Sequence, residues 1–534
     1  MRRITLCLSA VLYLAGQPIR AGAPTSAARQ QPDKSITADQ AWKLGWPSMQ
    51  GPFGNFLVPK TGAVLVDDLS KARLVWESDD RDFGRAKHTT GSFKAKGKVA
   101  ALLGPGAIAR PGGWAAPIIA GGKLFATTFR PAGRIYDVKT LFGTTEKAHL
   151  EAEDLVIALD ARTGKTLWKA VEPGGFVWGV GKRGGFQVAP VYYDGAVYSM
   201  GTTGRVFAYN AADGKKLWQT KAEPRMIEQR DKHLARSHVL QASARYGWQQ
   251  SLVFAGGTLI VPRKGTLLGL DPAGGKTRWA LANVISPWTT PSLWKHGGKD
   301  YLLCATAGKP GQAKLHLIDP RAGKILWTVG RLHATQFTLS PSRDHVLVNV
   351  GSSIIKEKAN GSAPRNADGK APFGLPGAYR ITPQGAKRVW TFPDKPHFLF
   401  PTWNDSTARP RIVIRDSLVY YASGGPDRET DCRLVIAREA TGEILVDQPR
   451  AKDFWFQLIE DKLLHCVDWS HGKRAAFNLY PTDPKSFKKL SGPWQPTLPL
   501  TTAYQVFMEP PVIAGHIFLR TKTGTVVCYD LRKE

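Results

Sequence analysis

Cysteine is scarce in this sequence, and its spacing excludes several kinds of site. Five cysteines occur in 534 residues, and Cys7 lies in the N-terminal apolar stretch. The other four form no Cys-x-x-Cys pair, no adjacent pair and no Cys-x-x-Cys-His sequence; they are Cys304, Cys432, Cys466 and Cys528. We therefore expect no dithiol redox centre, no cysteine-pair zinc site and no covalent haem. One or two disulfide bridges are compatible with an oxidising compartment, but spacing does not give their connectivity.

Long apolar runs are also missing beyond the N-terminus. Two arginines at positions 2 and 3 precede an apolar stretch from Ile4 to Ala15, which is too short to span a bilayer comfortably. Small residues suited to cleavage follow up to Ala23, although Pro24 disfavours a cut directly after it. The pattern predicts a signal peptide over residues 1–23, a periplasmic or secreted protein, and no transmembrane segment in the mature chain. An uncleaved N-terminal anchor is the alternative.

Acidic residues are outnumbered by basic ones. The chain has 73 Lys and Arg against 43 Asp and Glu, a formal net charge of +30. Such an excess favours polyanionic partners, although charge spread over solvated loops would serve solubility alone. Predicted export conflicts with nucleic acid as the partner. An anionic polysaccharide or an exported protein remains the expected partner, and we expect a monomer.

Glycine and proline, in contrast, are abundant, with 54 and 37 residues, which suits many short strands joined by turns. One strand–turn–strand pattern recurs with Asp or Asn, Gly and Trp at a fixed spacing. Its four clear copies are Asp160, Gly164 and Trp168; Asn210, Gly214 and Trp218; Asp271, Gly275 and Trp279; and Asp319, Gly323 and Trp327. Weaker copies are centred on Trp76, Trp390 and Val446, and a weak strand pair is expected over residues 476–490. The repetition predicts one supersecondary unit copied many times.

Each position of the repeat has a physical role. The Asp or Asn side chain accepts a hydrogen bond from the backbone two residues on, and Gly takes the positive φ that a short hairpin needs. The Trp ring on the second strand can cover the hairpin of an adjoining unit, where its N–H finds a backbone acceptor. One unit cannot bury both of its faces alone, so a closed ring of units is the stable arrangement.

The sequence therefore predicts an all-β propeller of about eight four-stranded blades, or seven if residues 476–490 form a loop. The strand ending at Asp530 lacks an outer partner, and Arg73–Trp76 is an outer strand with little before it. We expect the two ends to complete one joint blade. Residues 24–63 are treated as a linker and residues 64–534 as the propeller. Its loop insertions, which tend to gather on one face, are expected at residues 83–113, 140–153, 223–246 (with a helix) and 356–376.

The Asp-x-x-Thr-Gly-Lys-x-x-Trp pattern of residues 160–168 resembles the pyrroloquinoline-quinone-enzyme repeat, and the resemblance extends roughly from Trp76 to Asp530. That family includes quinoprotein alcohol dehydrogenases and the barrel-assembly lipoprotein BamB, which shares the propeller without the cofactor. The resemblance implies the fold but is nearly silent about activity.

A dehydrogenase of this family would need the quinone, Ca²⁺ held by oxygen ligands, a carboxylate base and a disulfide between adjacent cysteines. This chain has no adjacent cysteine pair. Its densest acidic cluster outside the repeats, which could be a calcium loop or a solvated turn, is Asp427, Glu429 and Asp431. We therefore expect a binding or scaffold protein that recognises a polypeptide or an anionic glycan, with no catalytic residues, metal or cofactor. The alternative is a dehydrogenase of alcohols or sugars that uses pyrroloquinoline quinone and calcium.

Candidate ligand-binding residues lie where the innermost strands are expected to begin, at the mouth of the central channel. They are Trp114, Gln187, Trp248, Trp288, Phe337, Trp455 and Tyr504, with Arg245 and Arg331 nearby. A ring of aromatic side chains could stack on sugar faces or a flat cofactor while the arginines hold anionic groups. The alternative is that these rings fill the channel as packing.

Overall fold

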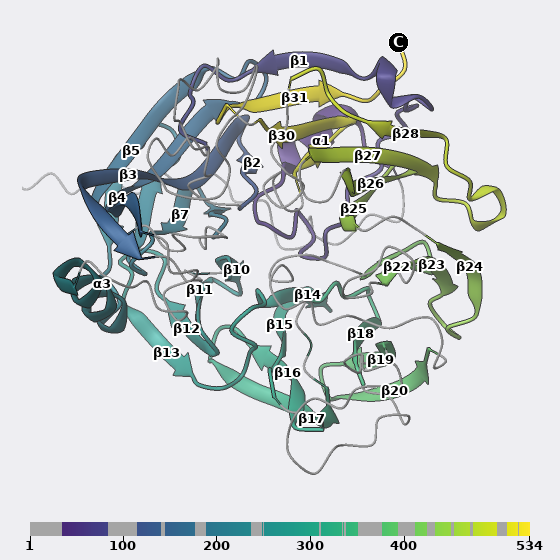
Figure 1. Cartoon of the computed structure of the whole chain (residues 1–534). Coiled ribbons are helices and arrows are strands. Elements are labelled where there is room, and N and C mark those ends of the chain that lie inside the picture. Colours follow the sequence, from purple (N-terminus) through teal and green to yellow (C-terminus); the bar gives the residue numbers. More distant parts are fainter. Residues whose placement is uncertain are drawn as a thin grey trace, which may run out of the picture.

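The computed structural model describes residues 35–83, 115–139, 145–176, 188–236, 248, 250–308, 311–333, 335, 338–350, 376–392, 412–423, 433–449, 453–469, 474–498, 510–521 and 523–534. Within these ranges the strands form eight sheets that stand around a common centre as the blades of a propeller (Figure 1). The predicted all-β propeller is confirmed, with eight blades and not seven.

Blades 1 to 4 follow one another along the chain, each with its first strand innermost (Figure 1). Blade 1 contains β2 (Ile118–Ala120), β3 (Lys123–Lys139), β4 (Thr145–Asp160) and β5 (Thr166–Phe176); blade 2 contains β6 (Val191–Tyr193), β7 (Ala196–Met200), β8 (Val206–Asn210) and β9 (Lys216–Gln219). Blade 3 contains β10 (Val253–Ala255), β11 (Thr258–Arg263), β12 (Thr266–Leu270) and β13 (Thr277–Leu281); blade 4 contains β14 (Ser292–His296), β15 (Lys299–Ala305), β16 (Ala313–Asp319) and β17 (Lys324–Leu332).

The remaining blades include the worn copies of the repeat. Blade 5 has three strands among its described residues, β18 (His345–Asn349), β19 (Pro376–Thr382) and β20 (Gly385–Thr391). Blade 6 contains β21 (Ile412–Arg415), β22 (Leu418–Ser423), β23 (Arg433–Arg438) and β24 (Ile444–Pro449). Blade 7 contains β25 (Asp453–Ile459), β26 (Lys462–Trp469), β27 (Arg474–Pro481) and, after the 3-10 turn Pro484–Ser486, β28 (Ser491–Trp494). The weak pair predicted over residues 476–490 is therefore part of a blade.

The two ends of the chain complete blade 8 together. Its inner strands are β29 (Val512–Ile513), β30 (His516–Arg520) and β31 (Val526–Asp530), and its outer strand is β1 (Arg73–Glu77), which follows the 3-10 turn Leu69–Lys71. In the antiparallel register, Arg73 lies opposite Asp530 and Trp76 lies opposite Cys528. Because the first and last strands share one sheet, the ring is held shut by backbone hydrogen bonds, as predicted.

The Asp, Gly and Trp of the repeat link neighbouring blades. In blade 1 the Asp160 carboxylate accepts hydrogen bonds from the backbone N–H groups of Arg162 and Thr163, at 2.9 and 2.8 Å. Gly164 has φ of 73°, in the region that favours glycine. The turn glycine then receives the Trp ring of the preceding blade: a Cβ on Gly275 would lie 2.7 Å from the ring of Trp218. The Trp motif is thus an interlock between neighbours.

The indole N–H groups of the interlock bond across the same boundaries. Their acceptors are backbone carbonyls of the next blade, at 2.8 to 3.2 Å: Trp168 to Ala211, Trp218 to Pro272, Trp279 to Pro320, Trp327 to Thr382 and Trp390 to Glu439. Trp76 closes the ring in the same way, since its ring lies against Gly164 of blade 1. The predicted backbone acceptors are therefore present at five boundaries.

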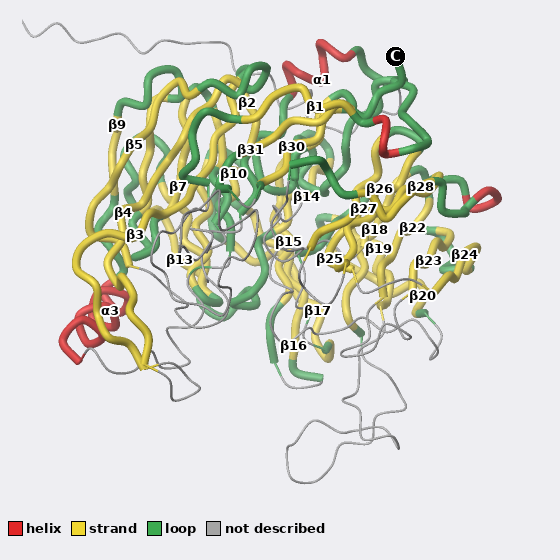
Figure 2. Tube along the Cα trace, turned by 45° about the horizontal axis from the view of Figure 1, so that its top comes forward, coloured by secondary structure: helices red, strands yellow, loops and turns green. Residues whose placement is uncertain are grey.

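Parts of two segments predicted as insertions, residues 145–153 and 223–236, lie within the described residues, on the face of the ring opposite the repeat turns, which we call the insertion face. The insertions predicted at residues 83–113 and 356–376 lie outside the described residues, except for Phe83 and Pro376. On this insertion face β3 and β4 extend into a long hairpin, and α3 (Pro224–Arg236) follows β9. Figure 2 shows α3 and this hairpin on the opposite side of the ring from α1 (Ala38–Leu44).

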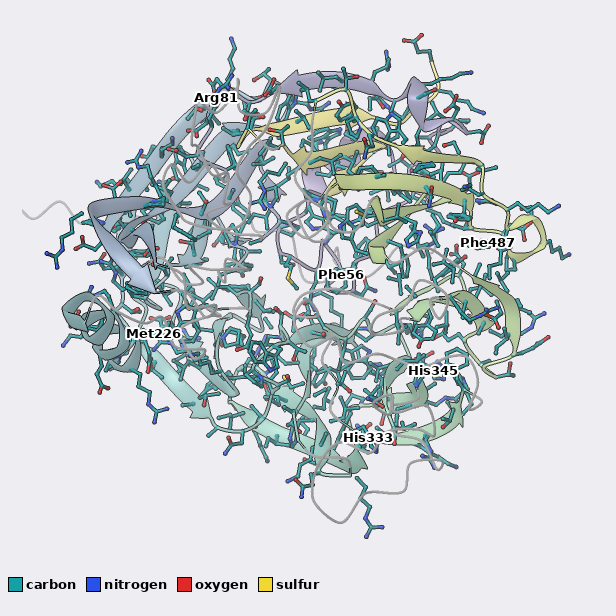
Figure 3. The ribbon with its side chains drawn as sticks, viewed as in Figure 1. Phe56, Arg81, Met226, His333, His345 and Phe487 are labelled. Carbon is teal, nitrogen blue, oxygen red and sulfur yellow. The ribbon has the colours of Figure 1, made fainter. Side chains whose placement is uncertain are left out.

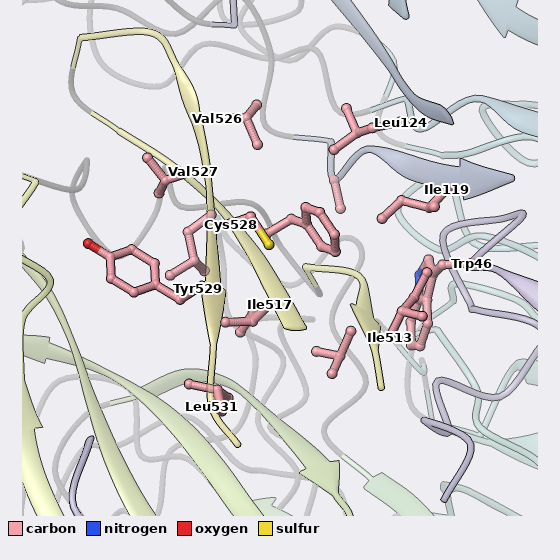
Figure 4. Close-up of a cluster of buried hydrophobic side chains, with 14 of the residues drawn as sticks. Trp46, Ile119, Leu124, Ile513, Ile517, Val526, Val527, Cys528, Tyr529 and Leu531 are labelled. Carbon is pink, nitrogen blue, oxygen red and sulfur yellow. The ribbon is translucent and has the colours of Figure 1, made fainter. Parts of the chain in front are cut away.

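Residues 35–66, most of which we treated as a linker, pack across the other face as an N-terminal strap. The strap begins with α1, whose Thr37 and Gln40 form a reciprocal capping box. Trp46 then pairs through its backbone with Ile119 of blade 1, and its side chain is fully buried in the cluster of Figure 4. Phe56 lies near the centre of the ring (Figure 3). The strap ends where Val66 bonds to Leu531 of blade 8.

The strap makes hydrogen bonds to every blade. After Ile119 of blade 1, it bonds to at least one residue in each later blade. These residues include Tyr192 in blade 2, Ser251 just before β10 in blade 3, Ser292 at the start of β14 in blade 4, Ser340 just before β18 in blade 5, Asp416 at the first turn of blade 6, Glu460 at the first turn of blade 7, and Leu531 in blade 8. Blades 3 and 7 stand on opposite sides of the ring, so a segment bonded to both crosses the axis. The strap therefore covers one end of the central channel.

The described cysteines and helices can be compared with what the sequence allows for disulfides and membrane spans. Cys304, Cys466 and Cys528 are buried and form no disulfide with one another, and burial raises the pKa of Cys304 and Cys528 above its ordinary value. No helix in the described ranges has the length and apolar character needed to cross a membrane.

Candidate binding site

A groove of about 1000 Å³ opens beside the strap, on the strap-side face. One wall is the strap itself, from Phe53 to Lys60. The other wall is built from first turns of three successive blades, at residues 295–297, 341–344 and 414–417, together with Glu439 from a repeat turn. These turns meet because every blade presents its first turn and its repeat turn to the same face, so the site is a direct product of the propeller topology.

Most charged side chains in the groove are paired within the protein. Lys60 Nζ lies 2.6 Å from a carboxylate oxygen of Asp416, which ties the strap to blade 6. Lys295 pairs with Asp300 of its own blade. Arg343, at the first turn of blade 5, is exposed, and its guanidinium has no hydrogen bond or ion pair within the described part of the chain. The groove therefore presents at least one free cationic group.

Glu439 is held by two neighbours from blade 5. Its Oε1 atom accepts a hydrogen bond from the Ser342 hydroxyl and lies 3.0 Å from Nδ1 of His345, which is labelled in Figure 3. Burial raises the pKa of this carboxyl, but the hydrogen bonds from His345 and Ser342 outweigh it, and the net pKa lies below its usual value. Glu439 thus stays ionised, and it joins blades 5 and 6 at the groove.

Arg415 is the unusual residue of the wall. It ends β21, and its side chain is only 2% exposed, yet Nε and Nη1 have no hydrogen-bond partner among the described residues. The nearest carboxylate oxygen, Asp416 Oδ2, lies 3.5 Å from Nε and already bonds to Lys60. Burial lowers the pKa of the guanidinium from its ordinary value, opposed by Tyr420, Asp416 and Glu460. A buried cation left this incompletely paired is costly to the fold.

The predicted channel-mouth residues are only partly within the described ranges. Trp248 is buried, and the ammonium group of Lys264 lies 5.6 Å from its ring centroid. Trp288 is half-buried before β14, whereas Trp455 is buried within β25 with its ring 5.7 Å from that of Phe477. Arg331 is exposed near the end of β17, on the outer side of blade 4.

The other candidates lie outside the described residues: Trp114, Gln187, Phe337, Tyr504 and Arg245. The same holds for the acidic cluster Asp427, Glu429 and Asp431. A ring of aromatic side chains around the channel entrance therefore stays a prediction.

The described residues do not fit the quinone and calcium that the repeat family can carry. In these ranges no three His, Cys, Asp or Glu side chains gather to hold a metal ion. The strap also places Met49 and Gln50 beside the inner strands of blades 3 and 4, where Met49 contacts Ser251 and the Gln50 amide donates to Ser292 at 3.1 Å. We therefore derive no step of a reaction through either group.

Sequence reasoning missed both the strap and the groove. The available signal was the density of large apolar side chains in a segment without the repeat, namely Trp42, Trp46, Phe53 and Phe56, all of which are buried. A solvated linker would not carry four such residues.

Comparison with known proteins agrees with this architecture. The sequence model of the family described as outer membrane protein assembly factor BamB matches residues 152–334, from β4 to the end of blade 4. No protein of curated function matches the sequence significantly.

Among solved structures, BamB from Moraxella catarrhalis is similar with 14% identity and a TM-score of 0.44, covering 71% of this chain and 89% of that one. A quinohemoprotein alcohol dehydrogenase from Comamonas testosteroni is similar with 11% identity and a TM-score of 0.49, covering 96% and 84%. The family model covers residues 152–334, about a third of the chain, and this match is consistent with the repeat geometry and the eight-bladed topology of a β-propeller built from pyrroloquinoline-quinone-like repeats.

Proposed function

We propose that this chain is an exported binding or scaffold propeller whose partner is another polypeptide. The observation that carries the proposal is the strap: the chain's own N-terminal segment occupies the axis and is bonded to all eight blades. A ligand that needs the axis from this face would have to displace it. The groove beside the strap, in contrast, is open, and its walls come from three blades and the strap.

The groove has the mixed character of a peptide-binding surface. Phe53, Val58 and Leu293 are mostly buried and line the groove with small apolar contacts, while the exposed Arg343 supplies hydrogen-bond donors. Interfaces of this kind gain affinity from apolar contacts and orientation from a few polar groups. Export follows from the signal peptide that the N-terminus predicts, and it restricts the partner to exported proteins.

The first experiment tests the enzyme alternative. The mature protein is purified from its native compartment, its absorption spectrum and metal content are measured, and dye-linked alcohol oxidation is assayed with added pyrroloquinoline quinone and Ca²⁺. We expect no turnover above a protein-free control. Turnover that depends on both additions would refute the proposal and favour a dehydrogenase.

The second experiment tests binding at the groove. A photo-crosslinking amino acid replaces Ser35, an exposed residue of the groove, or, as the control, Ala212, an exposed residue of a repeat turn in blade 2. We expect a defined polypeptide adduct from position 35 that is absent from position 212. Equal labelling from both positions, or none from position 35, would contradict a partner at the groove.

A further inference from the structure

We propose that the strap-side groove binds an acidic segment of the partner polypeptide, and that Arg343 and Arg415 receive its carboxylates. This inference rests on the proposed function, since it names the chemistry of the segment that the groove would hold. It commits to a peptide that carries both carboxylate and apolar side chains.

The first observation is that the protein's own carboxylates do not satisfy Arg415. Glu460 is used by the strap: its carboxylate accepts from the backbone N–H of Thr61 at 2.8 Å and of Gly62 at 3.1 Å. Asp416 bonds to Lys60, as described above. Nε and Nη1 of Arg415 have no hydrogen-bond acceptor in the described part of the chain. The side chain is enclosed in the wall of the groove beside Tyr420, so a ligand carboxylate reaches these two atoms only when the wall side chains shift.

The second observation is a free guanidinium in the same groove. Arg343 is exposed, and only its backbone takes part in a described contact, by accepting the indole N–H of Trp294 at 3.0 Å. Guanidinium groups match carboxylates through two parallel N–H···O bonds, which give orientation as well as affinity. Two arginines from successive blades can therefore hold carboxylates at two points along one segment.

The wall also disfavours a uniformly charged polyanion. Asp344, Asp416 and Glu439 line the same groove as the arginines, and they would repel a chain of closely spaced sulfates or carboxylates. Phe53, Val58 and Leu293 also line the groove, where 3–8% of each residue is exposed, and they offer small apolar contacts that such a ligand would not use. A peptide that alternates acidic and apolar residues fits both features.

The test uses a defined probe, an eight-residue capped peptide of alternating Glu and Val, and a matched peptide with Gln in place of Glu. Binding to the full-length mature protein is measured by calorimetry at low and at physiological salt. We expect the Glu peptide to bind at least tenfold more tightly than the Gln peptide, with an affinity that falls as salt rises. Similar affinities for the two peptides, or no binding of either, would overturn the inference.

Variants locate the site. Arg415→Gln and Arg343→Gln should each weaken the Glu peptide about tenfold, whereas Arg278→Gln, an exposed arginine paired with Asp271 on blade 3, should leave binding unchanged. If Arg415→Gln does not fold, the outcome is decided with Arg343→Glu, because the exposed Arg343 side chain has no hydrogen bond or ion pair with a described residue. Wild-type affinity in the Arg343 variants, or equal loss in Arg278→Gln, contradicts the assignment.

A sulfated glycan is tested as a competitor of the Glu peptide, with a neutral glycan as its control. If the sulfated glycan displaces the Glu peptide and binds more tightly than it, the ligand is a glycan and the inference is wrong. If cross-linking from position 35 persists in Arg415→Gln and Arg343→Gln, the proposed function stands while the carboxylate assignment fails. The two proposals can therefore fail separately.

Discussion

The interlock between blades can be tested at the boundary of blades 2 and 3. The Trp218 ring lies over Gly275, its Nε1 donates to the Pro272 carbonyl at 2.8 Å, and the ring of Tyr198 is 5.9 Å away. A fully buried Trp→Ala change costs about 3–5 kcal/mol, but the Trp218 ring is half-buried and water can reach the carbonyl it leaves. We therefore expect Trp218→Ala to lower the free energy of unfolding by roughly 2–3 kcal/mol.

The glycine side of the same contact allows a matched comparison. Gly275 and Gly257 have similar φ, 71° and 75°, so Ala at either position pays about 1 kcal/mol for left-handed backbone. At Gly257 no heavy atom lies within 4 Å of the added Cβ, whereas at Gly275 the Trp218 ring lies 2.7 Å away. Gly275→Ala should therefore cost about 1–2 kcal/mol more than Gly257→Ala, because the ring must move.

A double-mutant cycle isolates the interlock. In the Trp218→Ala background the ring is gone, and Gly275→Ala should cost no more than Gly257→Ala. The measurement is urea unfolding followed by far-UV circular dichroism, with slopes compared to confirm that the unfolding transition is the same. If the costs of Trp218→Ala and Gly275→Ala are additive, or if the two glycine changes cost the same, the Trp218 ring does not pack against the Gly275 turn.

Three further predictions concern closure and buried charge. Deleting residues 524–534 removes β31, which joins β1 to β30, and should abolish cooperative thermal unfolding; a truncated protein that melts like the full chain would contradict closure. Burial raises the pKa of Asp154 to about 6, so its carboxylate costs about 3 kcal/mol at neutral pH, and stability should rise as pH falls from 6 to 4. Asp154→Asn should raise the melting temperature at pH 7.5 and remove that pH dependence, whereas destabilisation at pH 7.5 would mean that Arg205 compensates the charge. Arg415→Met should leave the free energy of unfolding unchanged or raise it, because two nitrogen atoms of Arg415 are buried without a described hydrogen-bond partner. Arg520→Met removes a donor to the Phe83 carbonyl and should lower the free energy of unfolding by about 1–3 kcal/mol. A larger loss for Arg415→Met than for Arg520→Met would refute this difference between the two arginines.

The blades could be predicted from the sequence because their determinants are local. Asp160, Gly164 and Trp168 sit within nine residues of one another, and each acts on its own turn or on the adjacent blade. Ring closure could be predicted in the same way. The N-terminal end has an outer strand without a blade and the C-terminal end has a blade without an outer strand, so the two ends complete one sheet by pairing with each other. The depth of burial was less accessible: most of the repeat Trp rings are half-buried, because they lie on outer strands that face solvent on one side.

The strap could not be predicted because its contacts are remote in sequence and different at each blade. Gln50 bonds to Ser292, and Thr61 bonds to Glu460 almost 400 residues away. No periodic pattern marks such contacts, since each uses another residue type and another distance along the chain. The groove depends on the strap for one wall, so it was hidden for the same reason.

Two buried arginines differ in how completely the fold pairs their guanidinium groups. Arg520, on β30, donates to the Phe83 carbonyl at 3.1 Å and thereby fastens the chain after β1 to the closing blade. In the groove, Lys60, Lys295 and Glu439 are likewise paired with described neighbours. Arg415 departs from this rule, with two buried nitrogen atoms that form no hydrogen bond with a described residue. We therefore attribute the cost of burying Arg415 to the proposed ligand, whose carboxylate would supply the missing acceptor, and not to stability.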